Sequence, residues 1–166
     1  MTTNPDAVSI DTIIHAMYES ISGRAGAPRQ WERDRALYHP RALLIPTRPA
    51  DSGGAVADVF DMDGYIESRT PFFAQNDFFE IEIARREFRF GAIAHVLSFY
   101  EGRKAPGGEI LKRGVNSIQL FHDGERWWVM SILWDNERPG VTLPANPGSG
   151  LVSSEFGKPK SRSFQT

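Results

Sequence analysis

Two runs of alternating apolar and polar residues flank the dipeptide Asp123-Gly124, and residues 110–135 read ILKRGVNSIQLFHDGERWWVMSILWD. Alternation with a period of two predicts β-strands, and Asp-Gly between two such runs is a strong hairpin signal. The stretch therefore predicts two antiparallel strands, 110–122 and 126–135, joined by a two-residue turn. In that register His122 lies opposite Glu125.

The predicted register separates two faces of this hairpin. One carries an apolar set with a single polar pair that we expect in a pocket, Asn116 opposite Ser131. The other carries large apolar side chains that are too numerous for a face in water. These side chains predict a sheet-to-sheet homodimer interface: Trp128, Met130, Ile132 and Trp134. The alternative is that the C-terminal tail folds back over this face.

Two more strands precede the hairpin. In residues 78–90 the glutamates Glu80 and Glu82 alternate with apolar residues, and the apolar positions change from odd to even at Arg85-Arg86. That change of parity predicts a β-bulge near these two arginines. Residues 93–101 form the next expected strand.

The N-terminal part has a helical period. Residues 10–21 carry one apolar stripe behind the candidate N-caps Asp6 and Ser9, which predicts a first helix. A second helix is expected over 28–38, ended by Pro40, followed by a short strand over 42–45 and a loop over 51–58. A third helix should start at Asp61 or Asp63 and be limited by Pro71.

Helices followed by long antiparallel strands predict an α+β fold, in which a strongly curved, cone-shaped antiparallel sheet wraps three N-terminal helices. Such a sheet leaves a cavity at its open end, where ligands commonly bind. We divide the chain into a domain over 1–136 and a Pro/Gly/Ser-rich tail over 137–166.

The composition narrows the function classes. The 166 residues are 40% hydrophobic and 24% charged, carry a net charge of −2, and include no cysteine. This excludes disulfide frameworks and thiolate metal sites, and argues against nucleic-acid or anionic-membrane partners. The four scattered histidines form no metal motif, so we expect neither a metal nor a cofactor. Without a secretory signal or a membrane-length apolar run, we expect a cytoplasmic protein.

Three stretches resemble the nuclear transport factor 2-like superfamily in its SnoaL-like branch: FGAIAHVLSFYE over 90–101, RGVNSIQL over 113–120, and DGERWWV over 123–129 with Ser131 and Trp134. The similarity extends over about residues 8–136. It implies an α+β cone, usually dimeric. It does not imply one activity, because the superfamily includes isomerases, dehydratases, cyclases and non-catalytic binders.

The resemblance does not identify a set of catalytic residues in this sequence. The ketosteroid-isomerase type has a Tyr and two acids in its cavity, and the scytalone-dehydratase type has two His, an Asp and Tyr. This sequence matches neither set residue by residue. Our candidate acid/base is His95, and the loop over 102–108 leaves open whether it faces the cavity or the Ser117/Gln119 face.

Our first hypothesis is a homodimeric, non-metal protein that binds a small apolar or semi-polar molecule. Tyr18, Trp31, Asn116 and Ser131 are the expected pocket residues. The alternative is a cofactor-independent isomerase, dehydratase or cyclase that uses His95, with Tyr18 or Asn116 as hydrogen-bond donor. A third possibility is an interaction module whose own side chains fill the cavity.

Overall fold

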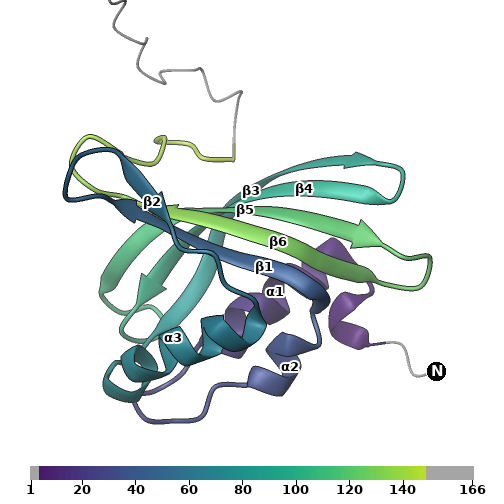
Figure 1. The fold of residues 1–166 in the computed structure, drawn as a ribbon, viewed down its shortest axis with the longest axis horizontal. Coiled ribbons are helices and arrows are strands. Elements are labelled where there is room, and N and C mark those ends of the chain that lie inside the picture. The colour runs from purple at the N-terminus through teal and green to yellow at the C-terminus, as the bar shows by residue number, and fades with distance from the viewer. Residues whose placement is uncertain (1–3, 149–166) are drawn as a thin grey trace, which may run out of the picture.

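The computed structural model describes residues 4–148, which form three α-helices and one six-stranded sheet (Figure 1). The helices are α1 (Ile10–Ile21), α2 (Trp31–Arg35) and α3 (Met62–Gln75), after a short 3-10 turn, η1 (Pro5–Ala7). The strands are β1 (Tyr38–Pro49), β2 (Ala55–Ala57), β3 (Phe79–Phe90), β4 (Ile93–Arg103), β5 (Ile110–His122) and β6 (Trp127–Asn136). Their order in the sheet is β2-β1-β6-β5-β4-β3.

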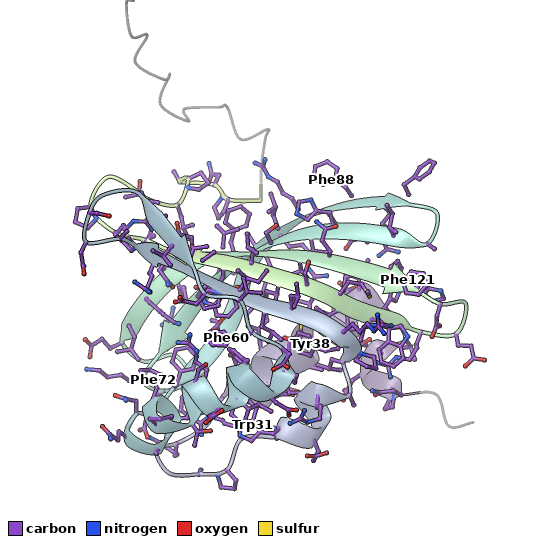
Figure 2. All side chains as sticks on the ribbon, in the orientation of Figure 1. Trp31, Tyr38, Phe60, Phe72, Phe88 and Phe121 are labelled. Carbon is purple, nitrogen blue, oxygen red and sulfur yellow. The ribbon has the colours of Figure 1, made fainter. Side chains whose placement is uncertain are left out.

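All three helices lie on one side of the curved sheet, as Figure 1 shows. We call the side of the sheet that faces them the inner face, and the opposite side the outer face. Tyr38 and Trp31 lie on the helix side, whereas Phe88 points away from it (Figure 2). Every strand pair is antiparallel except β1 with β6, which is parallel. The predicted α+β cone is therefore confirmed, with one parallel pair added.

The first and third helices begin where their capping residues predict. Ser9 accepts a hydrogen bond of 3.1 Å from the backbone N–H of Thr12 at the start of α1. Asp61 accepts one of 2.8 Å from the N–H of Gly64 at the start of α3. Each cap satisfies an N–H group that the helix itself leaves unpaired. The helix predicted over 10–21 is confirmed at both ends.

The second helix and the strand after it differ from the prediction. α2 ends at Arg35, and β1 begins at Tyr38 and continues through Pro40. The pairing of β1 with β6 is interrupted between Tyr38 and Leu43, so the missing N–H of Pro40 costs no ladder bond. Pro71 likewise does not end α3, and residues 55–57, expected in a loop, form β2.

A β-bulge interrupts β3, as the change of parity predicts, but slightly earlier in the strand. Glu82 pairs with Tyr100 and Ala84 pairs with Phe99, so Ile83 is the extra residue. Ile81, before the bulge, and Ile83, within it, are 44% and 39% exposed, and Glu80 and Glu82 lie on the inner face. The glutamates are tolerated inside because polar partners from β4, β5 and α1 meet them there.

The last hairpin also differs from the prediction. His122 pairs with Trp127, so the turn has four residues, and the Asp123 carboxylate accepts hydrogen bonds from the N–H groups of Glu125 and Arg126. Near the turn the two predicted faces are still correct. A second bulge then follows, because Leu120 pairs with Val129 and Gln119 pairs with Ser131. Met130 is the extra residue.

The bulge at Met130 exchanges the faces of the rest of β6. Ile132 lies opposite Ile118 and Trp134 opposite Asn116, so both side chains are on the inner face. Their assignment to the outer, dimer-forming face was wrong. Ser131 lies opposite Gln119 on the outer face, so its predicted pairing with Asn116 was also wrong.

The chain after β6 reaches the outer face. The N–H of Glu137 donates to the carbonyl of Arg113, and a Cβ atom added at Gly148 would be in van der Waals contact with Ala84. The division into 1–136 and 137–166 stays a prediction, and its last part, 149–166, lies outside the described residues. No helix among residues 4–148 combines the length and apolarity needed to cross a bilayer.

Candidate functional site

A cavity of about 180 Å³ lies between the sheet and the helices. Its wall is mainly aromatic and aliphatic, and four tyrosines contribute to it: Tyr18, Tyr38, Tyr65 and Tyr100. The other polar lining residues are Arg69, Glu80, Lys112 and Asn116. An apolar wall with a few convergent polar groups is typical of a small-molecule site.

Tyr18 lies at the centre of a hydrogen-bonded chain that joins α1 to three strands. Its hydroxyl oxygen is 2.7 Å from Oγ of Ser98 and accepts a bond of 2.9 Å from Nδ2 of Asn116. Ser98 in turn donates to Oε1 of Glu82 at 2.5 Å. Because the Ser98 hydroxyl donates its hydrogen to the Glu82 carboxylate, the Tyr18 hydroxyl is the donor in its hydrogen bond with Ser98. Burial raises the pKa of Tyr18 far above its ordinary value, and it stays a neutral hydrogen-bonding group.

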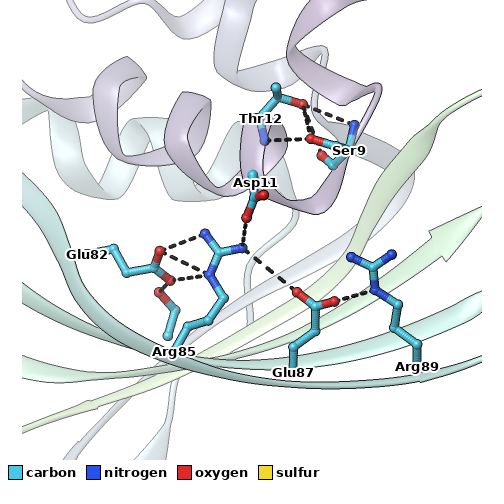
Figure 3. Close-up of polar contacts among 8 residues, drawn as sticks. Ser9, Asp11, Thr12, Glu82, Arg85, Glu87 and Arg89 are labelled. Atoms are coloured by element: carbon cyan, nitrogen blue, oxygen red, sulfur yellow. Dashed lines mark hydrogen bonds and ion pairs between the residues drawn. The ribbon is translucent and has the colours of Figure 1, made fainter. Parts of the chain in front are cut away.

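Glu82 is held in place by an ion-pair network that connects α1 with β3 (Figure 3). Arg85 binds the Glu82 carboxylate at 2.7 Å and the Asp11 carboxylate, from α1, at 2.7 Å. Glu87, farther along β3, lies 3.9 Å from the same guanidinium. This network borders a second, open cleft of about 710 Å³ between α1 and β3. The charged side chains of this cleft already form ion pairs with one another. We therefore regard the aromatic cavity as the candidate site.

Glu80 is an acid of the cavity wall that the sequence analysis did not include among the candidate site residues. Glu80 is 8% exposed, and burial raises the pKa of its carboxyl group above the ordinary value. Lys112 and a hydrogen bond with Asn116 oppose that rise. Asn116 therefore contacts both Tyr18 and Glu80, and it is placed in the cavity where the sequence predicts it.

Asp34 is a second buried acid, next to the tyrosines of the cavity. It is 1% exposed, and neither carboxylate oxygen has a hydrogen-bond partner among residues 4–148. Burial raises its pKa to about 8, with Arg35 opposing the rise. Asp34 is close enough to Tyr38 and Tyr65 for its charge to add to the burial that raises their pKa values. In the sequence, Asp34 lies three residues from both Trp31 and Leu37, on the apolar face of the helix predicted over 28–38. This spacing was the signal that could have indicated its burial.

The other predicted site residues lie outside the cavity wall. His95 is on the outer face, where its Nε2 is 3.0 Å from Oγ of Ser117, so the acid/base role proposed for it in the cavity is not available. Trp31 packs behind the wall, 6.4 Å from the ring of Tyr65 between centroids. Ser131 is on the outer face, as described above.

The four predicted interface residues are divided between the two faces. Ile132 and Trp134 line the cavity, and the Trp134 ring packs 5.9 Å from that of Tyr65. Trp128 lies opposite Phe121 on the outer face, and its Nε1 donates to Asp123 at 2.7 Å. Met130 is the bulge residue. Within residues 4–148, no three His, Cys, Asp or Glu side chains are grouped so that they could hold a metal ion.

No family model and no curated protein matches the chain. Several solved structures, however, are similar to it in fold. A candidate calcium/calmodulin-dependent protein kinase type II association domain from Thiobacillus denitrificans has 10% identity and a TM-score of 0.60, covering 81% of this chain and 100% of that one. A protein of unknown function from Mycobacterium tuberculosis has 13% identity and a TM-score of 0.58, with coverages of 86% and 80%.

A third similar structure carries a fold name. It is an uncharacterised protein with a cystatin-like fold from Caulobacter vibrioides, with 12% identity, a TM-score of 0.53, and coverages of 79% and 89%. At these identities the similarity concerns the fold and not the activity. The chain therefore has the cystatin-like α+β cone, which is the fold implied by its resemblance to the nuclear transport factor 2-like superfamily.

Proposed function

We propose that this protein binds a small, partly apolar molecule in the cavity between the sheet and its helices. The observation that carries the proposal is the aromatic wall of that cavity, interrupted by Asn116 and Glu80 at one place. Apolar surface supplies affinity through burial, and buried polar groups set the orientation of the ligand.

The buried acids favour a second candidate function, cofactor-independent acid/base catalysis. Glu80 and Asp34 are both removed from water, and burial raises the pKa of each. Groups with such shifts are common in active sites, where a proton must be held or moved near neutral pH. In this candidate an isomerase, dehydratase or cyclase uses Glu80 in the role first considered for His95, because Glu80 lines the cavity.

Ligand screening with a pair of neighbouring variants tests the first proposal. Ile132→Phe adds volume to the cavity wall, and Leu133→Phe makes the same kind of change on the outer face, where Leu133 is 41% exposed. Compounds that raise the melting temperature of the wild type should lose their effect on Ile132→Phe and keep it on Leu133→Phe. Equal effects on both variants would place binding elsewhere. Circular dichroism confirms that both variants are folded.

We also propose that two copies associate through their outer faces. Apolar side chains from three strands are exposed there: Phe88 at 61%, Ile93 at 58% and Leu133 at 41%. Large apolar side chains exposed on one face of a sheet favour association, and a symmetric dimer can cover them by placing the same face of both subunits together.

A further inference from the structure

Two cations line the cavity, and neither is neutralised by an ion pair. Arg69 comes from α3 and Lys112 from β5. Among residues 4–148, neither forms an ion pair with a carboxylate. By contrast, Arg103 and Arg113 on the adjacent strands both pair with Glu101. The cavity therefore contains positive charge that the described residues leave uncompensated.

Both cations are held over aromatic rings, which leaves their N–H groups available. The Arg69 guanidinium lies 5.8 Å from the centre of the Tyr65 ring, and its Nε is buried without a hydrogen-bond partner among the described residues. The Lys112 ammonium lies 4.9 Å from the centre of the Phe78 ring. Cation–π contact fixes the position of a cation without using up its donors.

The charge balance of the cavity wall is positive in either state of Glu80. With Glu80 ionised, two cations face one anion; with Glu80 protonated, no anion remains. Burial raises the pKa of Glu80, which favours the second state, although Lys112 opposes it. A half-buried positive charge attracts an anionic group more strongly than one in open water.

The volume limits the apolar part of the ligand. A cavity of about 150 Å³ holds one benzene ring, and this cavity has about 180 Å³. One ring and one small charged group therefore fit. We propose that the ligand is a small organic carboxylate with a single ring or a comparable apolar body, whose carboxylate binds Arg69 and Lys112. This inference rests on the proposed function and adds the chemical class of the ligand.

A matched set of one-ring probes tests the charge of the ligand. Benzoate, benzamide and benzylammonium have similar size and differ in charge, and ligand-observed NMR at low ionic strength measures their dissociation constants. Because a hydrogen bond to a charged group contributes more than a neutral one, benzoate should bind at least about tenfold more tightly than benzamide. Benzylammonium should bind most weakly. Phenyl phosphate serves as the other anion, and tighter binding of phenyl phosphate would overturn the carboxylate assignment.

Variants identify the cations. Arg69→Gln and Lys112→Gln should each weaken benzoate binding by about tenfold and leave benzamide binding unchanged. The charge-retaining variants Arg69→Lys and Lys112→Arg should keep most of the benzoate affinity. Lys104→Gln is the matched control, because Lys104 is exposed and pairs with Glu109 in the β4–β5 turn.

The outcomes separate this inference from the proposed function. If benzamide or benzylammonium binds as tightly as benzoate, and Ile132→Phe abolishes that binding, the cavity binds ligands and the carboxylate assignment is wrong. If benzoate binds equally to wild type and to both Gln variants, the inference is also wrong. If no probe binds the wild type, the inference fails, and the broader screen with Ile132→Phe then decides the proposed function separately.

Discussion

Asn116 on β5 donates a hydrogen bond of 2.9 Å to the hydroxyl of Tyr18 on α1. Both residues are almost completely buried, at 4% and 5% exposed. The contact joins the first helix to the strand before last, and it fixes the amide at the point where the cavity wall turns from apolar to polar.

Removing the Tyr18 hydroxyl should destabilise the protein. Tyr18→Phe removes the buried acceptor of the Asn116 amide and the buried donor to Ser98, which should lower the free energy of unfolding by about 1–3 kcal/mol. Urea denaturation measures this value. The control is Tyr100→Phe, which removes a hydroxyl that donates to one partner, the half-buried Asn136 at the end of β6. A loss in Tyr18→Phe no larger than in the control would contradict a structural role for the chain.

Asp34 should make stability fall as the pH rises. Burial raises its folded-state pKa to about 8, and an unfolded Asp titrates near 3.9. Between these values the folded protein binds one proton more than the unfolded chain. Its contribution to the free energy of unfolding should therefore decrease by about 1.4 kcal/mol per pH unit across this range.

The comparison with Asp34→Asn isolates this effect. The amide cannot ionise, so the difference in unfolding free energy between wild type and variant should change with pH from about 4 to about 8 and level off above it. Denaturation at a series of pH values measures the difference. A pH-independent difference would show that Asp34 is ionised or solvated in the folded protein.

The bulge at Met130 predicts opposite behaviour for two adjacent residues. Trp134→Ala removes a side chain of the inner face and should lower the free energy of unfolding by about 3 kcal/mol. Leu133→Ala, on the outer face, should cost less than about 1 kcal/mol. Only the Leu133→Ala loss should depend on protein concentration, because this residue contributes to the proposed dimer. Similar losses in both variants, independent of concentration, would contradict the register.

Charges on the outer face should separate the proposed dimer. Phe88→Glu together with Leu133→Glu places two unpaired charges in the interface, and desolvating them would cost more than the contact returns. Light scattering at micromolar concentration should give the mass of two chains for wild type and of one chain for the variant. Val59→Glu, an exposed apolar residue before α3, is the control. A monomeric wild type would disprove the association.

Most of the fold could be predicted from the sequence, because local signals and tertiary structure agree along most of the chain. The stripe of α1, the cap Asp61 and the alternation in β3 to β6 each depend on neighbours in sequence. The start of β1 was missed because Pro40 was read as the end of a helix, and the parallel partner that accommodates it is distant in sequence.

The site was harder to predict, because it depends on which way each strand residue points. Tyr18 and Asn116 lie in the cavity wall as expected. Ile132 and Trp134 were assigned to the wrong face because a bulge leaves no mark in the alternation pattern when the residues after it, Ile132 to Trp134, are all apolar. Glu80 was missed because a glutamate alternating with apolar residues is read as solvent-facing, and its partners come from other elements.

The extra residue at Met130 has an evolutionary consequence. A deletion of that one codon would restore regular pairing in β6 and leave every flanking side chain on its present face, because Val129 already lies opposite Leu120 and Ser131 opposite Gln119. A one-codon deletion later in the strand that kept the bulge would instead move each following side chain to the other face. Such a deletion would exchange ligand-contacting and partner-contacting positions without replacing any amino acid, so the position of a length change in this strand decides whether related chains diverge in what they bind.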